Sequence, residues 1–323
     1  MKRHVNIPIF IPHLGCPNMC VFCNQRTISG RAGFDISSVD AEIKNALSTI
    51  DGACEVEIAF FGGSFTGIDR EMMTALLQTA EKYIKSGYAS SIRLSTRPDY
   101  INEEILDILK SYSVRTIELG IQSMNDEVLR ASKRGHTAKC TEKACGLIVG
   151  GGFDLVGQMM IGLPVSSGES ELECAEFICR VGAAAARVYP TVVFYDTELS
   201  EMAAKGQYQP LTLSEAVTRT KNVLAVFADR GVPCIRVGLQ SGENLSSGET
   251  VYAGPSHSAV GELAMSELFY DKIRVQLEHQ KGSVHGADLT IIAPRGSTSK
   301  IVGHKGVNKK RIKDEYKIKN IKI

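Results

Sequence analysis

Three cysteines near the start of the chain are the residues best suited by type and spacing to carry chemistry. Cys16, Cys20 and Cys23 fall within eight residues, and Gly15 and Pro17 disfavour a helix across this stretch. Three thiolates in one loop can ligate an iron–sulfur cluster and leave one iron without a protein ligand. Such an iron can bind a second molecule, so the loop is a candidate catalytic centre.

Two other interpretations of the cysteines are open. A structural zinc site prefers four ligands, and His13 is the nearby side chain that could complete a Cys3His set. Three buried cysteines without any ligand are less expected, because three at this spacing in one loop would be an unusual coincidence.

The spacing C-x3-C-x2-C, with Phe22 beside the last cysteine, resembles the signature of the radical S-adenosylmethionine (radical SAM) superfamily. The resemblance implies a [4Fe–4S] cluster on Cys16, Cys20 and Cys23 whose remaining iron binds S-adenosylmethionine (SAM). It also implies that one electron from the reduced cluster cleaves SAM to a 5′-deoxyadenosyl radical, with a reductase, flavodoxin or ferredoxin as electron donor. In such an enzyme the protein supplies position and excludes water.

The composition describes a large globular chain and names no partner. Its 323 residues are 43% hydrophobic with a net charge of +1, enough to bury a core as one α/β domain with or without an appendage. No apolar segment is long enough to be a signal or to span a membrane, so we expect a cytoplasmic protein with no membrane partner. Nine cysteines fit a reducing compartment better than a disulfide framework. Six of them are scattered, and we expect small buried side chains at Cys54, Cys140, Cys145, Cys174, Cys179 and Cys234.

Strand and helix patterns alternate along most of the chain with a period of about thirty residues. The expected strands are 5–12, 56–61, 91–96, 116–121, 155–161 and 187–194. The expected helices are 39–50, 70–85, 102–111, 125–133, 137–149, 170–181, 214–230 and 260–268. This alternation predicts an α/β fold with a parallel sheet and right-handed crossovers. It matches the open (β/α)6 partial TIM-type barrel of the radical SAM superfamily, here with a small basic C-terminal α+β extension.

Polar or glycine-rich segments follow the predicted strands, and parallel strands would bring them to one edge of the sheet. Gly62, Gly63 and Ser64 follow the second strand, where missing side chains would let a ligand approach the backbone. This segment resembles the Gly-Gly-Glu motif with which radical SAM enzymes grip the methionine part of SAM, with Ser64 in place of the acid. The same resemblance implies that SAM also contacts polar side chains on later strands: Ser95, Gln122, Arg134 and Gln158. The alternative for each is an ordinary paired amide or hydroxyl, or a surface charge.

A closer resemblance begins at Ser95. The segments 95–100 (STRPDY), 117–123 (IELGIQS), 128–137 (VLRASKRGHT), 161–164 (IGLP) and 187–191 (RVYPT) are similar to the radical SAM domain of the Elongator catalytic-subunit family. Oxygen-independent coproporphyrinogen oxidase is a more distant resemblance. The Elongator family has wider spacing before its second cluster cysteine and carries an acetyltransferase domain that is not expected in a chain of this length. The resemblance therefore implies radical SAM chemistry on RNA, a tRNA in particular, without the acetyl transfer.

The end of the chain is strongly basic. Residues 295–323 hold ten Lys and Arg against two acidic residues, a net charge of +8. Their expected order is strand 287–293, helix 297–302, a Gly-His-Lys-Gly turn, helix 307–316 and strand 318–323, which resembles the minimal core of a KH domain. Glycines permit close approach and the basic side chains favour phosphate. The candidate nucleic-acid-binding residues are Gly303, His304, Lys305, Gly306, Lys309, Lys310 and Arg311; a solvated tail without a partner is the alternative.

Three segments and three functions follow from these patterns. We expect a radical SAM partial-barrel domain at 1–240, a barrel extension at 241–286 and a KH-like tail at 287–323. The leading hypothesis is a radical SAM enzyme acting on RNA. One alternative is a radical SAM enzyme for a small metabolite or tetrapyrrole, and the other is a non-catalytic RNA-binding protein with a structural zinc or iron–sulfur site. The sequence does not indicate the oligomeric state.

Overall fold

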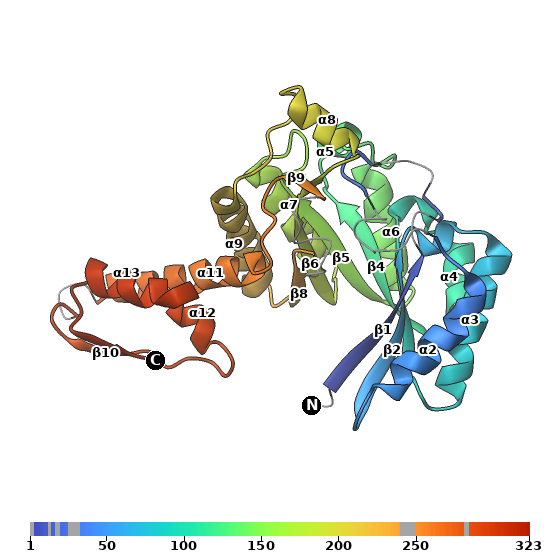
Figure 1. Cartoon of the computed structure of the whole chain (residues 1–323), viewed down its shortest axis with the longest axis horizontal. Coiled ribbons are helices and arrows are strands. Elements are labelled where there is room, and N and C mark those ends of the chain that lie inside the picture. The colour runs from blue at the N-terminus through green and yellow to red at the C-terminus, as the bar shows by residue number, and fades with distance from the viewer. Residues whose placement is uncertain (1–2, 12–13, 17–19, 25–32, 240–249, 281–283) are drawn as a thin grey trace.

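A curled sheet of seven parallel strands forms the centre of the molecule (Figure 1). The computed structural model describes residues 3–11, 14–16, 20–24, 33–239, 250–280 and 284–323. The strands are β1 (Arg3–Ile11), β2 (Cys54–Gly62), β3 (Ser91–Thr96), β4 (Val114–Gln122), β5 (Asp154–Ile161), β6 (Ala185–Pro190) and β8 (Cys234–Val237), paired in that order. The predicted partial barrel is confirmed, and β8 adds a seventh strand to the six expected.

Helices cover the outer side of the curled sheet (Figure 1). They are α2 (Val39–Ser48), α3 (Arg70–Lys85), α4 (Glu103–Lys110), α6 (Ala138–Gly150), α7 (Gly168–Arg180) and α9 (Leu213–Asp229). Local signals set several of their starts: the Asn102 side chain accepts from the N–H of Ile105, and Thr212 and Glu215 form a reciprocal capping box. Between these helices and the sheet lies the main core, in which Ile58, Leu94 and Ile117 are fully buried.

The stretch 187–194 differs from its prediction. The expected strand 187–194 is divided, since β6 ends at Pro190, where the N–H and the hydroxyl of Thr191 both donate to the carbonyl of Ile161. The chain then forms the short strand β7 (Val193–Phe194), which pairs antiparallel with β9 (Val251–Ala253). Two short helices, α5 (Asp126–Ala131) and α8 (Glu198–Ala204), lie at the rim where the strands end (Figure 1).

Helix α11 (Val260–Glu278) continues ten residues past its predicted end. It does so because both of its ends are packed: Ala264 and Leu268 contact Leu224 of α9 in one apolar cluster, and Tyr270, Ile273 and Leu277 belong to a second cluster in the tail. One helix thus joins the barrel to the tail, which lies to its side (Figure 1).

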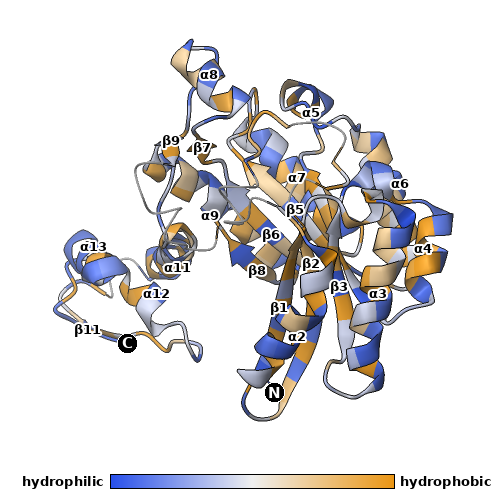
Figure 2. Ribbon diagram, turned by 45° about the vertical axis from the view of Figure 1, so that its right-hand side comes forward, coloured by the Kyte–Doolittle hydropathy of each residue, from blue (hydrophilic) through white to orange (hydrophobic). Residues whose placement is uncertain are grey.

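The tail has the predicted order of elements. It consists of β10 (Asp288–Thr290), α12 (Thr298–Val302), the 3-10 turn η4 (His304–Gly306), α13 (Val307–Glu315) and β11 (Asn320–Lys322), with β10 and β11 parallel. The helix α13 is predominantly hydrophilic (Figure 2). The division into three segments stays a prediction, and its first boundary, between residues 240 and 241, lies outside the described residues.

The scattered cysteines are buried to different degrees. Cys145 and Cys174 are fully buried, whereas Cys54, Cys140, Cys179 and Cys234 are half-buried. Burial raises the pKa of Cys145 to about 12, so this thiol stays protonated and inert. Among the helices of the described residues, none has the length and apolar character needed to cross a membrane.

Candidate active site

The cysteine loop follows β1 and is attached to the rim by backbone hydrogen bonds. The N–H of Val21 donates to the carbonyl of Ser132 after α5 (3.3 Å), and the carbonyl of Val21 accepts from the N–H of Leu199 in α8 (2.8 Å). Cys20 is buried, and Cys16 and Cys23 are half-buried. In the part of the chain that is described, no three metal-ligating side chains are grouped within reach of one ion. Binding itself would have to draw the three sulfurs together, as is usual where a metal site forms only with its metal. His13, the alternative zinc ligand, lies outside the described residues.

The segment Gly62-Gly63-Ser64 packs directly on the cysteine loop. The N–H of Gly63 donates to the carbonyl of Ile11 (2.8 Å), and that of Ser64 donates to the carbonyl of Leu14 (2.9 Å). A Cβ at Gly63 would lie 1.9 Å from the Leu14 carbonyl oxygen. This close approach is a second reason for glycine, distinct from the predicted approach of a ligand: the bare backbone lets the cysteine loop sit on β2.

We expect Gly63→Ala to damage the cysteine loop as a whole. The new Cβ would force the Leu14 backbone away, and overpacking of this kind costs about 1–3 kcal/mol. The free energy of unfolding measured in urea should fall, and so should the amount of iron bound after anaerobic reconstitution. Gly146→Ala in α6 is the matched control, since a Cβ there meets nothing within 4 Å. Equal stability and iron content for the two variants would contradict this role of Gly63.

The Ser64 hydroxyl is already engaged. It is fully buried and hydrogen-bonded to the hydroxyl of Thr96 (2.8 Å), which also bonds to Thr66 (2.6 Å). The N–H of Arg97 donates to the same Ser64 oxygen (3.3 Å). In this arrangement the Ser64 hydroxyl links the end of β2 to the end of β3.

Two buried arginines face the cysteine thiols. Arg134 has one guanidinium nitrogen 3.3 Å from the sulfur of Cys20, and another donates to the carbonyl of Gly120 (2.7 Å). Arg97 makes two 2.9 Å bonds to the carboxylate of Asp99 and also donates to the carbonyl of Arg134. Burial raises the pKa of Cys16, and the positive charges of Arg97 and Arg134 oppose that rise. Both cations therefore favour thiolates at this loop.

Each of these arginines keeps one buried N–H group without a partner in the described structure, Nη1 of Arg97 and Nε of Arg134. Buried donors are normally paired, and an unpaired one costs free energy. Unsatisfied guanidinium donors beside thiols fit an anionic group such as a cluster or a carboxylate. Arg134 was among the predicted site residues. Arg97 and Asp99 were not, although they lie in the segment 95–100; a charged pair directly after a buried strand was the signal for them.

Gln122 is brought to the same place. It has a positive φ of 64°, uncommon for a residue with a side chain, at an irregularity in the pairing of β4 with β5. A Cβ on Gly120 would lie 3.1 Å from Gln122 Nε2 and 3.2 Å from an Arg134 nitrogen, so these two side chains converge over Gly120. The Oε1 of Gln122 is buried without a partner among the described residues, and backbone strain of this kind is typical of functional sites.

The other two predicted side chains, Ser95 and Gln158, lie within strands β3 and β5 and not in the segments that follow them. Gln158 Nε2 donates to Glu118 Oε2 (2.7 Å), and the half-buried Ser95 lies in register with Glu118 on the neighbouring strand. Glu118 is fully buried and also accepts from Arg93 (3.0 Å) and Arg187 (2.7 Å). The structure thus brings Gln122 and Arg134 to the cysteines and places Gln158 in a buried ionic network.

That network continues to Glu57 on β2. Arg93 donates to Glu57 Oε2 from two nitrogens (2.9 and 2.7 Å), and Ser91 and His4 contact the same carboxylate. Burial raises the pKa of Glu57, but Arg93 and these hydrogen bonds outweigh it and hold the pKa below its usual value. Ionised carboxylates and guanidiniums therefore link neighbouring strands of the sheet.

Glu118→Ala is expected to destabilise the protein by about 3–5 kcal/mol, because it would leave the buried guanidinium of Arg187 without its counter-charge and would remove one of the two carboxylates that pair with Arg93. Urea unfolding of purified protein would measure the loss. Glu104→Ala removes a carboxylate that pairs with Arg70 on the surface (3.3 Å) and should cost less than about 1 kcal/mol. A similar cost for both substitutions would show that the buried network adds nothing to stability.

Comparison with known families agrees with this geometry. The model of the Radical SAM superfamily matches residues 10–178, and that of the Radical_SAM C-terminal domain matches residues 183–269. An uncharacterized protein of Methanocaldococcus jannaschii is 29% identical over 229 residues, 67% of this chain and 70% of that protein. Human Elongator complex protein 3 is 28% identical over 260 residues, and the tRNA uridine(34) acetyltransferase of M. jannaschii is 27% identical over 183 residues.

These last two relatives are much longer than the part they share with this chain. The match spans 67% of the chain but 47% of the human protein, and 50% of the chain but 34% of the archaeal acetyltransferase.

Among solved structures, Elp3 of Methanocaldococcus infernus has a similar fold with a TM-score of 0.65 at 20% identity, covering 85% of this chain and 64% of that one. Coproporphyrinogen III oxidase of Escherichia coli has a TM-score of 0.52 at 17% identity, covering 71% and 54%. The chain belongs to the radical SAM superfamily and is a radical SAM enzyme.

Proposed function

We propose that this enzyme binds a [4Fe–4S] cluster through Cys16, Cys20 and Cys23 and acts with SAM on RNA, specifically on a tRNA. The observation that carries the cofactor part is the pair of buried arginines near the cysteine thiols, each of which keeps one N–H group without a partner in the described structure. Together, a bound cluster and SAM would supply the one-electron cleavage that produces a 5′-deoxyadenosyl radical. In the cell this requires a reductase, flavodoxin or ferredoxin as electron donor.

The protein's own residues would position SAM from several strands. Arg134 and Arg97 can donate to its carboxylate, and the Oε1 of Gln122 can accept from its ammonium group. Gly62, Gly63 and Ser64 would act through their backbone, because the Ser64 hydroxyl is bonded to Thr96. Ser95 and Gln158 are proposed as further contacts, and Gln158 would use its Oε1, since its Nε2 donates to Glu118.

RNA as substrate has two lines of support. The archaeal relatives named tRNA uridine(34) acetyltransferase share half of this chain, although their acetyl transfer is not carried over here. The basic tail is the second. His304, Lys305, Lys309 and Lys310 are exposed around a turn in which Lys305 itself has a positive φ of 53°.

The two glycines of this turn differ in their surroundings. A Cβ at Gly306 would meet nothing within 4 Å, so the backbone there is open to a ligand, whereas one at Gly303 would lie 2.9 Å from Asn308. We propose that Gly306 and the exposed basic side chains contact phosphate. Arg311 has a different task in the structure, since it pairs with Glu267 (2.6 Å) and lies over the Tyr270 ring (3.7 Å), both on α11. Gly303 and Arg311 would support the RNA contact by holding the turn and the tail in place.

The test is 5′-deoxyadenosine production by reconstituted, reduced enzyme with and without bulk tRNA, followed by mass spectrometry of the tRNA nucleosides. The proposal expects tRNA-dependent product and a new nucleoside mass. Stimulation by a small-molecule extract instead of tRNA would favour the metabolite or tetrapyrrole alternative. Tight RNA binding with no SAM cleavage at full cluster loading would favour a non-catalytic module.

A further inference from the structure

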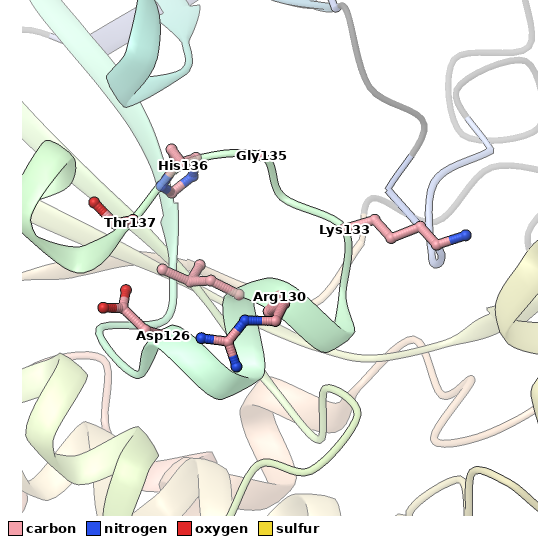
Figure 3. A pocket seen from close by; sticks show the side chains of 7 residues that line it. Asp126, Arg130, Lys133, Gly135, His136 and Thr137 are labelled. Carbon is pink, nitrogen blue, oxygen red and sulfur yellow. The ribbon is translucent and has the colours of Figure 1, made fainter.

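A cavity of about 520 Å³ lies on the rim next to the cysteine loop (Figure 3). Its walls come from α5, the turn that follows and the start of α6, and are formed by Asp126, Leu129, Arg130, Lys133, Gly135, His136 and Thr137. Arg134 lies in the middle of this turn but is directed to Cys20 instead. One short turn therefore separates the cavity from the candidate cofactor site.

The cavity has a cationic side. Arg130 and Lys133 are exposed, and Arg130 has no ion-pair partner within the described residues. Lys133 forms an ion pair with Glu198 of α8 (2.6 Å). Asp126 opposes these charges only in part, since its Oδ1 accepts the N–H of Ala138 at the start of α6 (2.7 Å). The charges and the polar backbone of Gly135 suit a phosphate group at this wall.

The opposite wall carries a buried hydrogen-bond acceptor. His136 is 8% exposed, and burial, followed by the charge of Arg134, lowers its pKa to about 4, so the ring is neutral at physiological pH. Its Nδ1 lies 3.3 Å from the Thr141 hydroxyl, which itself donates to the carbonyl of Thr137. This network assigns the ring proton to Nδ1. The remaining nitrogen, Nε2, is buried without a partner in the described structure.

A buried acceptor without a donor is costly, and a ligand with an N–H or O–H group would remove that cost. A nucleotide combines such a donor, on its base or ribose, with a phosphate. The cavity volume lies within the range of about 300–1,000 Å³ usual for small-molecule sites, and the buried Leu129 adds an apolar wall. Free phosphate alone would leave His136 unsatisfied.

We propose that this rim cavity binds a nucleotide of the RNA substrate that neighbours the reacting one, with its phosphate at Arg130 and Lys133 and a ribose or base donor on His136 Nε2. The proposal rests on the proposed action on RNA and adds to it a subsite that holds the strand beside the cofactors. Single-stranded RNA is read in this way, through splayed nucleotides whose edges and 2′-hydroxyls are exposed.

The probe is uridine 5′-monophosphate (UMP), titrated into the full-length protein while the imidazole NMR signals are recorded. The His136 signal, assigned by its loss in His136→Phe, should shift with UMP. In Arg130→Gln/Lys133→Gln the affinity for UMP should fall about tenfold or more, as expected for lost charged hydrogen bonds. A weaker affinity for 2′-deoxy-UMP would identify the 2′-hydroxyl as the donor to His136, and an equal affinity would identify the base.

Two controls separate pocket charge from other effects. Lys139→Gln removes an exposed charge on α6 that does not line the cavity, and Glu198→Gln removes the partner of Lys133 without changing the pocket charge. Lys139→Gln should bind UMP like the wild type, and Glu198→Gln should bind it at least as tightly, because Lys133 no longer pairs with a carboxylate.

The outcomes distinguish this inference from the proposed function. If UMP leaves the His136 signal unchanged and the double variant binds tRNA like the wild type, the subsite is overturned, even where tRNA stimulates SAM cleavage. If UMP binding depends on Arg130 and Lys133 but tRNA has no effect on SAM cleavage, the nucleotide site stands and the action on RNA fails.

Discussion

Changing any one of Cys16, Cys20 and Cys23 to Ala is expected to abolish SAM cleavage and most iron binding. With three protein ligands, a [4Fe–4S] cluster has one open iron, and a further lost thiolate leaves two irons without protein ligands. Cys20 should be the most sensitive of the three, because it is buried and contacts Arg134. Iron and sulfide analysis, the visible absorption band and 5′-deoxyadenosine production would measure the effect after anaerobic reconstitution.

Cys179→Ala is the matched control for this series. Cys179 is half-buried in α7, away from the cysteine loop, so its variant should keep its iron and its activity. If the triple Ala variant still bound a full cluster, the assignment of these ligands would be wrong. Zinc bound in place of iron by protein prepared anaerobically with both metals would favour the structural zinc site.

The pair His304→Asp and Lys305→Asp is expected to weaken tRNA binding strongly. Both side chains are exposed, so charge reversal should replace attraction to phosphate by repulsion with little effect on folding. The slope of log K against log salt is negative, and each lost phosphate contact makes it less steep by about 0.7–0.9. Filter binding at several salt concentrations would therefore show both a lower affinity and a shallower slope.

The control for the tail is a charge change on its sheet that is slightly larger, Lys319→Asp with Lys322→Asp, which lowers the net charge by 4 where the turn pair lowers it by 3 with His304 neutral. Both residues are exposed and flank or lie in β11, away from the turn at Gly303–Gly306. Equal RNA affinity for the two double variants would exclude the turn as the contact. Truncation after Pro294 is a poorer test, because it would uncover Tyr270, Ile273 and Leu277 of α11, which are buried against the tail, and would expose an apolar face.

Much of the fold could be predicted because it is encoded locally. Apolar periodicity placed α3 at Arg70–Lys85 and β3 at Ser91–Thr96, with the bounds that the structure has. The strand–helix alternation predicted a parallel sheet, since neighbouring parallel strands need a crossover of about this length. The missed elements include the short α8, β8 and β9, which span few residues and carry weak periodicity.

The candidate site was only partly predictable, because its contacts join residues far apart in the chain. The spacing of Cys16, Cys20 and Cys23 was enough to suggest a cluster, and it also led to Arg134 through a family motif. Nothing local indicated that Arg97 would lie between Asp99 and the Arg134 carbonyl. The length of α11 was likewise underestimated, since its second half is stabilised by residues that follow it in the chain, some of them, such as Ile301 and Ile312, by more than twenty positions.

By itself, then, the sequence predicted a set of cluster ligands and determined the order of strands and helices and the concentration of positive charge in the tail, all of which are properties of short segments. Tertiary structure alone decided the roles of the polar residues around the cysteines. Gly63 is needed where the cysteine loop packs on the end of β2, the Ser64 hydroxyl is bonded to Thr96, and His136, which lines a cavity, has a buried nitrogen without a partner among the described residues. The physical reason is that a side chain's partners depend on which strands and loops the fold brings within a few ångströms, and residue spacing along the chain does not contain that distance.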